Sequence, residues 1–433
     1  MKEVYRVKPE DVPESERIQP QESTKKFVIT TTIIMIFACL GLYGASFLLK
    51  LVTKNPAFQG FSEINNITPL LLGLKGCIEM TYASRLSTMA NTGRLTSAPK
   101  LIRASFFNFA LILAQAINIS LFAVAVNVGI FSVTSVMTFD RVARFLLAVL
   151  STALLASCIL VYAITSIVYL TRFIRVNPDN ICSPFAAVAG DSAALLILNY
   201  VGQYVYDDRL PITVVWGLIA LIFFIGAVCV VVALLHEETR EALGYGSVSI
   251  IVATLIFIGV GAIFNHSVGR HPSTANYQLI LNGVGGNLVA ILASKMSTSL
   301  HQLNESEKAA VVKQWSRYLN PLQMWKDKKN GIIMLFLLII GMVLQATEIT
   351  CITLFTPNSI RHPVFIAIYL FICVFQILIL FYACVFLTQC LFAYNINPDN
   401  NSIPILTAFA DLLGALFLAC CLWFYKYFYV WNV

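Results

Sequence analysis

Two acidic residues inside strongly apolar stretches are the positions in this sequence best suited to chemistry. Asp191 and Asp411 each lie seven residues after a proline, and each proline follows a copy of the tetrapeptide Asn-Pro-Asp-Asn. An Asp at the centre of a bilayer costs about 2.5–3.5 kcal/mol on insertion scales, and such residues are usually functional. Two carboxylates that share a site require a cation or a proton between them. The pattern predicts a cation site at Asp191 and Asp411; the alternative is that Ser or Thr hydroxyls satisfy each carboxylate.

Further oxygen ligands are expected from two glycine-containing stretches around Gly76 and Gly286. Glycines loosen a helix, and freed carbonyls in a membrane are tolerated only where they face protein, water or an ion. Close helix packing is the alternative role for these glycines. Asn287 offers an amide oxygen, and Glu79 offers a third carboxylate that has no acidic counterpart in the other stretch. The predicted metal ligands are therefore Asp191, Asp411, Glu79, Asn287, Gly286 and Gly76, and we predict no catalytic or cofactor-binding residues.

The expected donors are carboxylate, carbonyl and amide oxygens, which suit a hard cation. Mg²⁺ keeps most of its water and needs only about one or two carboxylates, whereas Ca²⁺ prefers roughly six to eight direct oxygen ligands. The donor set therefore favours Mg²⁺, as a transported ion rather than as a resident cofactor.

The tetrapeptides themselves have a structural interpretation. Asp179, Asn180, Asp399 and Asn400 are expected to cap the helices that follow them, because short polar side chains satisfy the free N–H groups of a first helical turn. A role at the cytoplasmic mouth of an ion path is the alternative.

The elements that must position these residues are membrane helices. Of the 433 residues, 58% are hydrophobic and 12% are charged, about half the charged fraction of a soluble protein. This composition excludes a water-soluble globular protein and leaves too little soluble surface for nucleic-acid binding. A spanning helix needs about 20 apolar residues. Eleven such runs predict an all-α polytopic protein of the lipid bilayer: 27–51, 66–90, 104–134, 142–171, 184–206, 211–235, 248–268, 276–300, 331–355, 363–394 and 403–430.

The distribution of Lys and Arg predicts the orientation. Residues 1–26 are polar and are expected to form a disordered cytoplasmic tail. With the N-terminus inside, eighteen Lys and Arg residues lie on the cytoplasmic side and eight lie on the other side. Cytoplasmic loops of membrane proteins carry such an excess. An odd number of spans then places the C-terminus outside, and the expected location is the plasma membrane.

An internal repeat relates the two halves of the chain. Residues 72–88 match residues 282–298 at an offset of 210, and the two tetrapeptides match at an offset of 220. One helix between two five-helix units restores the starting side of the membrane, so the halves should be parallel and related by a pseudo-two-fold axis. A chain with both halves is expected to function as a monomer. The predicted division is a tail at 1–26, a first repeat at 27–206, a linker helix at 207–240 and a second repeat at 241–433.

These motifs resemble solute carrier family 41. The resemblance rests on residues 67–88, on residues 282–290 and on the paired Asn-Pro-Asp-Asn segments, and it extends over most of the chain. It implies a Mg²⁺ transporter in which each half is similar to the membrane domain of bacterial MgtE channels. It also implies that some members exchange Mg²⁺ for Na⁺.

The resemblance assigns roles to individual positions. Asp191 and Asp411 match the acidic pore residues that hold Mg²⁺ in the family. The family's Gly-Asn pair is present as Gly286-Asn287, whereas Cys77 stands where the first half of the family usually has Asn. Because cysteine carries no amide, an amide ligand from the first half is in doubt at this position.

Two other functions are compatible with the sequence. The protein could carry another divalent cation, with Cys77 softening the site, or it could be a membrane scaffold or receptor in which the carboxylates brace the bundle. An enzyme is not expected, because the five histidines form no His-Glu-x-x-His pair and no nucleophile motif lies beside them.

Overall fold

The structure is a computed structural model, and it describes residues 23–55, 62–95, 97–134, 138–174, 176–206, 210–270, 274–303, 305–326, 328–356 and 359–429. Residues 1–22 of the predicted tail lie outside this part of the chain. The described residues form helices and their connections, without a strand. The helices are α1 (Thr24–Lys54), α2 (Ser62–Asn91), α3 (Ala98–Thr134), α4 (Phe139–Phe173), α5 (Pro178–Val205), α6 (Ile212–Leu234), α7 (Glu237–Glu241), η4 (Ala242–Gly246), α8 (Ser247–Arg270), α9 (Thr274–His301), α10 (Glu305–Gln314), η5 (Trp315–Leu319), η6 (Pro321–Trp325), α11 (Lys328–Phe355), α12 (Pro363–Ala393) and α13 (Pro398–Tyr429).

Ten of the described helices are long and apolar enough to cross a membrane. The remaining predicted span corresponds to α2, whose 30 residues would extend over about 45 Å at the α-helical rise. Nearly all of its described side chains between Leu70 and Thr88 are buried. The polar residues of α2 therefore face protein instead of lipid, which explains why this helix is less apolar than the others. The chain is an all-α, multi-pass integral membrane protein, as predicted.

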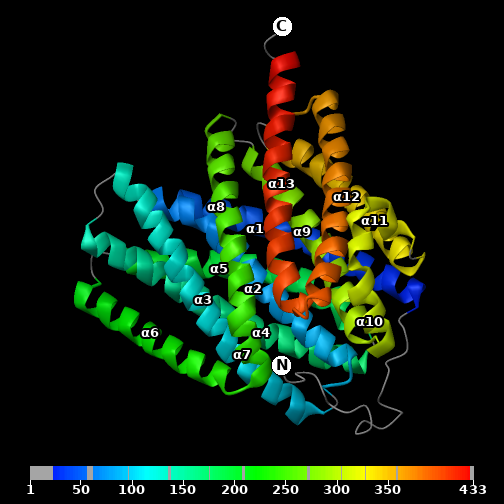
Figure 1. The fold of residues 1–433 in the computed structure, drawn as a ribbon. Coiled ribbons are helices and arrows are strands. Elements are labelled where there is room, and N and C mark those ends of the chain that lie inside the picture. The colour runs from blue at the N-terminus through cyan, green and yellow to red at the C-terminus, as the bar shows by residue number, and fades with distance from the viewer. Residues whose placement is uncertain are drawn as a thin grey trace.

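The helices of the two halves have corresponding neighbours. In the first half, α5 packs against α1, α2 and α4; in the second half, α13 packs against α8, α9 and α12. The contacts between the halves also form an equivalent pair. Helix α5 touches α9, and its counterpart α13 touches α2, the counterpart of α9. Figure 1 shows α2, α9 and α13 at the centre of the bundle.

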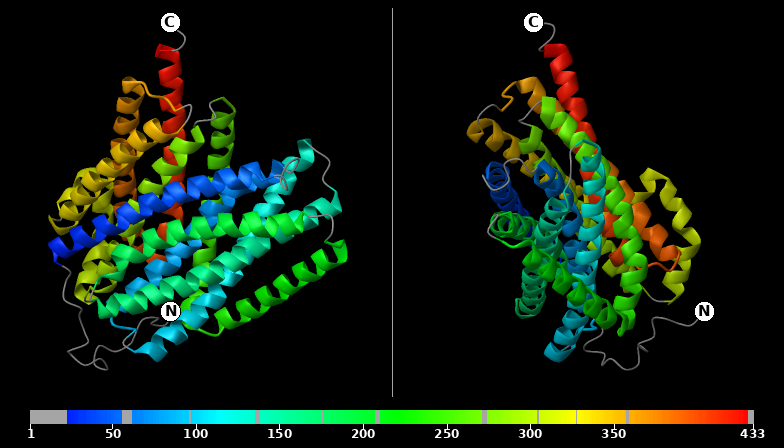
Figure 2. Two further views of the ribbon diagram at one scale, coloured as in Figure 1. Left: turned by 180° about the vertical axis from the view of Figure 1, so that it is seen from behind. Right: turned by 90° about the vertical axis from the view of Figure 1, so that its left-hand side faces the viewer.

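The first helix of each half also reaches the other half. Besides its contact with α5, α1 packs against α9 and α11, and α8 likewise packs against α2 and α3. In the left view of Figure 2, α1 in blue extends from the yellow helices of the second half to the cyan and green helices of the first. The two halves are therefore interlocked.

The segment between the halves begins with α6, which lies at the edge of the bundle against α3 and α4 (Figure 1). The short α7 and the π-helical η4 follow and lead into α8. The side-chain amide of Gln115 in α3 donates a hydrogen bond to the carbonyl oxygen of Ala242, with a length of 3.3 Å. This contact fastens the turn before α8 to the first half.

Candidate ion site between the two halves

A cavity of about 140 Å³ lies between the two halves, lined by residues of α1, α2, α5, α8, α9 and α13. Asp191 of α5 and Asp411 of α13 both line it, and they are the charged residues among its described lining. The two carboxylates interact electrostatically with each other. The aspartates singled out by the repeat therefore meet at one cavity, one from each half.

The helices that hold the aspartates begin earlier than the sequence suggested. The last three residues of each tetrapeptide are part of the helices, since α5 starts at Pro178 and α13 at Pro398, while Pro184 and Pro404 lie inside them. Asp191 is thus 13 residues from the start of α5, or about 20 Å along its axis. In a helix that begins at the membrane surface, an aspartate about 20 Å along the axis lies within a hydrocarbon core about 30 Å thick.

Three of the other predicted ligands also line this cavity. Gly76 of α2 and both Gly286 and Asn287 of α9 face it. The side-chain oxygen of Asn287, a residue that is 1% exposed, has no hydrogen-bond partner among the described residues. The same holds for Asn282, a cavity residue that sequence reasoning did not select. Two asparagines of α9 thus border the cavity, and their buried side-chain oxygens have no hydrogen-bond partner among the described residues.

The glycines of α2 and α9 separate into two kinds. A Cβ atom at Gly76 or Gly286 would meet nothing within 4 Å among the described residues, so these two glycines keep the cavity open. A Cβ atom at Gly283 would lie 2.6 Å from the side chain of Leu42 in α1, and one at Gly73 would collide with the ring of Phe257 in α8. Close helix packing is therefore the role of Gly73 and Gly283, three residues earlier in each case.

Cys77 lines the cavity at the position where the family Asn was expected. Its sulfur lies 3.1 Å from the hydroxyl oxygen of Thr407 in α13, and the thiol donates to the carbonyl oxygen of Pro404 at 3.6 Å. Thr407 also lines the cavity. The first half therefore contributes a thiol to the site, and this thiol is held against the second half.

Glu79 is not among the residues that line the cavity. It forms an ion pair with Lys75 one turn earlier in α2, and the two side chains are 2% and 3% exposed. The Glu79 carboxylate lies directly against Gly190 of α5, where a Cβ atom would collide with it. Lys75 interacts electrostatically with Asp191, the next residue after Gly190. Sequence reasoning missed Lys75; the signal was its spacing of four residues from Glu79, which places both on one helix face.

The tetrapeptides form a second polar region, at the end of the molecule where α5 and α13 begin. The helix caps are Asn177 and Asn397, whose side-chain oxygens each accept a hydrogen bond of 3.0 Å from the backbone N–H two residues later. The expectation that Asp179 and Asp399 cap these helices was wrong. Both aspartates are buried and point to the other half of the protein instead.

Each buried aspartate is hydrogen-bonded to the opposite half. Asp179 accepts hydrogen bonds from Ser294 and Thr298 of α9, with lengths of 3.0 and 2.9 Å. Asp399 accepts one from Ser84 of α2, with a length of 2.7 Å. Buried carboxylates require such donors because an unpaired buried charge is costly. The two halves are joined by this network at the tetrapeptide end.

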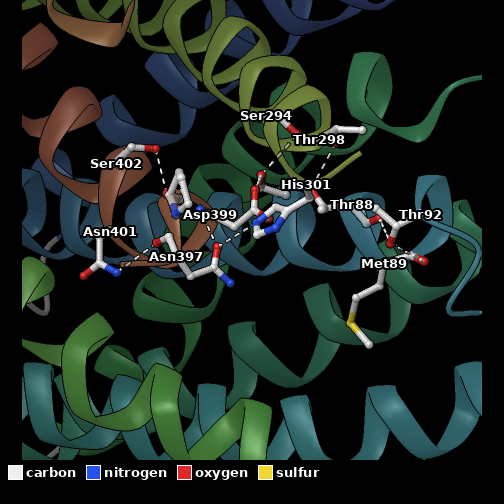
Figure 3. Close-up of polar contacts among 12 residues, drawn as sticks. Thr88, Met89, Thr92, Ser294, Thr298, His301, Asn397, Asp399, Asn401 and Ser402 are labelled. Carbon is white, nitrogen blue, oxygen red and sulfur yellow. Dashed lines mark hydrogen bonds and ion pairs between the residues drawn. The ribbon is translucent and has the colours of Figure 1, made fainter. Parts of the chain in front are cut away.

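The network is not fully symmetric. Asn91, at the end of α2, donates to Asn177 at 2.9 Å and to Asp179 at 2.7 Å. His301 occupies the equivalent end of α9; its Nε2 lies 3.3 Å from the side-chain oxygen of Asn397 and 3.9 Å from Asp399. Figure 3 shows this histidine between α9 and the start of α13. A neutral amide in one half is therefore replaced by a titratable ring in the other.

The donor set of the cavity suits a hydrated ion. No group of three or more His, Cys, Asp or Glu residues close enough to hold a metal occurs among the described residues. The cavity is lined by two carboxylates and two asparagines, and it has space for several waters. A cation that retains most of its hydration shell fits such a site better than one that must be stripped and chelated.

Comparisons with known proteins agree with the repeat. The profile of the MgtE family, described as divalent cation transporter, matches residues 68–201 and 278–421. Solute carrier family 41 member 3 of Rattus norvegicus is 31% identical over an alignment of 413 residues, covering 92% of this chain and 87% of the rat protein. The corresponding protein of Mus musculus is 32% identical, with 90% and 80% covered. Member 2 of Gallus gallus is 30% identical, with 93% and 71% covered. No solved structure matches the chain.

Each of the two matched segments contains one aspartate of the cavity, Asp191 in the first and Asp411 in the second. The profile therefore occurs twice, once in each half, and the similarity to the curated relatives extends over nearly the whole chain. This confirms the resemblance found in the sequence and indicates a transporter instead of an enzyme. The chain belongs to solute carrier family 41, within the MgtE family of divalent cation transporters.

Proposed function

We propose that this protein moves Mg²⁺ across the membrane through the cavity between its two halves. The observation that supports the proposal is that Asp191 and Asp411, one from each half, line a single cavity. Asn282 and Asn287 also line it, and their side-chain oxygens have no hydrogen-bond partner among the described residues. Two carboxylates in a confined site repel each other, and a divalent cation between them removes that repulsion. Mg²⁺ is the cation that binds with few carboxylates and many retained waters.

The other residues of the site have separate roles in this proposal. The amide oxygens accept hydrogen bonds from the waters of the hydrated ion, and Gly76 and Gly286 leave space for those waters. Glu79 is not proposed as a ligand of the ion. It forms a buried ion pair with Lys75, and neither residue lines the cavity. The ion therefore interacts chiefly with Asp191 and Asp411.

Coupling to Na⁺ is part of the proposal. An inside-negative membrane potential favours cation entry by about 2.3 kcal/mol per charge per 100 mV. Moving a divalent ion outward against this potential costs twice as much free energy as moving a monovalent one. Export of Mg²⁺ therefore requires a second ion that moves down its gradient, such as entering Na⁺. Transport that does not depend on Na⁺ would instead describe a channel or uniporter.

We also propose the arrangement of the chain in the cell. The predicted tail, first repeat 27–206, linker 207–240 and second repeat 241–433 agree with a family profile that matches once on each side of the linker. We place the N-terminus in the cytoplasm, the C-terminus outside and the protein in the plasma membrane as a monomer. Accessibility of N- and C-terminal epitope tags in intact and permeabilised cells tests the orientation.

The test is Mg²⁺ flux into proteoliposomes for the intact protein and for the double variant Asp191→Asn with Asp411→Asn, with and without a Na⁺ gradient. We expect the double variant to lose flux while remaining folded. Glu237→Gln serves as the matched control, because Glu237 also carries a carboxylate but is 64% exposed on α7. Equal flux in the double variant and the control would refute the site. The dependence on Na⁺ decides between exchanger and channel.

Transport of a softer divalent metal is the second candidate, and the thiol of Cys77 in the cavity lining favours it. Thiolates prefer metals such as Zn²⁺ to Mg²⁺. Competition of Zn²⁺, Mn²⁺ and Ca²⁺ with Mg²⁺ flux in the same proteoliposomes distinguishes the two candidates.

A further inference from the structure

The Lys75–Glu79 pair lies beside the ion cavity, and the repeat shows that it belongs to one half only. At the offset of 210 that relates α2 to α9, the equivalents of Lys75 and Glu79 are Gly285 and Val289. The pair thus has no charged counterpart in the second half. Its presence in one half makes the site electrostatically asymmetric.

The second half fills the corresponding space with a neutral group. A Cβ atom at Gly285 would lie 3.1 Å from the side-chain nitrogen of Gln376 in α12. That nitrogen donates a hydrogen bond of 3.1 Å to the carbonyl oxygen of Ala410, the residue before Asp411. In the first half, the residue before Asp191 is Gly190, and the Glu79 carboxylate lies against it. An amide thus stands beside one cavity aspartate, and an ion pair stands beside the other.

Two carboxylates act on the ammonium group of Lys75. It is paired with Glu79, and it also interacts electrostatically with Asp191. A buried ammonium requires a carboxylate partner because its desolvation is otherwise costly. A lysine side chain is long and flexible, so its charge can shift between neighbouring acceptors.

The charges of this region depend on which partner Lys75 takes. With Lys75 on Glu79, the cavity presents two free carboxylates, Asp191 and Asp411, whose combined charge matches one divalent cation. With Lys75 on Asp191, the cavity keeps only one free carboxylate, and its attraction for a divalent cation falls. Glu79 therefore controls the charge of the cavity without lining it.

We propose that Lys75 is an internal competitor of the transported cation for Asp191, and that Glu79 withdraws it when a divalent cation occupies the cavity. This inference rests on the proposed function, because it assumes that Asp191 and Asp411 hold the transported ion. Lys75 and Glu79 are specificity-determining residues that act on the ion through Asp191. The competition weakens binding enough to allow release, which a transporter requires of its ion site.

Single substitutions of the pair should change Mg²⁺ affinity in opposite directions. In Glu79→Gln, Lys75 keeps Asp191 as its partner, so the Mg²⁺ concentration for half-maximal flux should rise about tenfold. In Lys75→Gln, the competitor is absent, so that concentration should fall by a similar factor and maximal flux should fall because release is slower. The double variant Lys75→Gln with Glu79→Gln restores a cavity with two free carboxylates and should return toward the wild-type affinity.

Binding provides a readout that is independent of transport. The Mg²⁺ concentration that raises the thermal unfolding temperature of the detergent-purified variants should shift in the same directions, because a ligand stabilises the state that it binds. Lys326→Gln is the control for loss of a lysine, since Lys326 is exposed between η6 and α11. If Lys75→Gln does not yield folded protein, Glu79→Gln and the double variant are enough to test the inference. In Glu79→Gln the lysine still has Asp191 as a partner, and in the double variant both charges of the pair are removed.

The outcomes separate this inference from the proposed function. If the Lys75–Glu79 pair only stabilises the fold, both single variants lose stability, and they either leave the Mg²⁺ affinity unchanged or shift it in the same direction. Either result overturns the inference, provided that Asp411→Asn still abolishes flux. If Asp411→Asn has no effect on flux or on Mg²⁺-dependent stabilisation, the proposed function itself fails. Opposite shifts with recovery in the double variant establish the competition.

Discussion

Thr88 of α2 and Thr298 of α9 are equivalent residues of the repeat, 210 positions apart, and their hydroxyl oxygens lie 3.1 Å from each other. One turn earlier, the hydroxyl oxygens of Ser84 and its own equivalent, Ser294, also lie 3.1 Å from each other. Equivalent residues can meet at two successive levels only if α2 and α9 run in the same direction across an approximate two-fold axis. The axis thus passes between these two helices. The two contacts lie closer to the tetrapeptides than the cavity-lining residues of α2 and α9 do.

The hydrogen bond from Ser84 to Asp399 should contribute measurably to stability. Ser84→Ala removes the donor and leaves a buried carboxylate oxygen unsatisfied, which costs about 1–3 kcal/mol. Thermal unfolding of the detergent-purified protein measures the loss. Ser299→Ala is the control, because Ser299 is exposed and its hydroxyl bonds only to the carbonyl oxygen of Lys295 in its own helix. Equal stability of the two variants would contradict a bracing role for the network.

Two glycines on one face of α2 should respond differently to the same substitution. Gly73→Ala places a methyl group against the ring of Phe257, which is 3% exposed, so we expect a loss of about 1–3 kcal/mol. Gly76→Ala meets open space and should leave stability unchanged, while the added methyl group narrows the cavity and lowers Mg²⁺ flux. Unfolding temperature and flux, measured on both variants, check this. A stable Gly73→Ala protein would show that the contact between α2 and α8 can relax.

Cys77 should influence which metals compete for the site. Cys77→Asn replaces the cavity thiol by an amide oxygen donor, so inhibition of Mg²⁺ flux by Zn²⁺ or Cd²⁺ should weaken while inhibition by Mn²⁺ is retained. Cys77→Ser, which keeps a donor for the contacts with Thr407 and Pro404, is the companion variant. Unchanged inhibition in both variants would place the metal away from position 77.

An ion pair between a buried glutamate and a partly exposed arginine connects the start of α2 to the start of α4. Arg141 donates to both carboxylate oxygens of Glu63 at 2.7 Å, and Glu63 is 0% exposed. Arg141→Gln leaves this carboxylate buried without its partner, which should cost about 3–5 kcal/mol, whereas joint replacement of both residues by Leu should cost much less. Arg240→Gln is the matched control, because its pair with Glu237 is exposed and should contribute little. A small effect of Arg141→Gln would mean that water reaches Glu63.

Much of the fold could be predicted from the sequence because it depends on local properties. Runs of apolar residues long enough to span a bilayer identify the membrane helices, and α2 stands out among them as a buried helix by its glycines and polar residues. The repeat, visible at offsets of 210 and 220, pairs Asp191 with Asp411 by their positions in the chain alone. That both line one cavity follows from the two-fold relation between the halves.

Which polar side chain meets which partner was decided only by the tertiary structure. The sequence led us to expect a cap at Asp179, whereas Asn177 caps α5 and the packing of α5 beside α9 turns Asp179 toward Ser294 and Thr298. Glu79 looked like a ligand because its charge is evident in the sequence, while its pairing with Lys75 depends on side-chain conformation and on the space beside Gly190. Hydropathy and helical periodicity are encoded along the chain, whereas the partners of buried charges depend on contacts between helices distant in sequence.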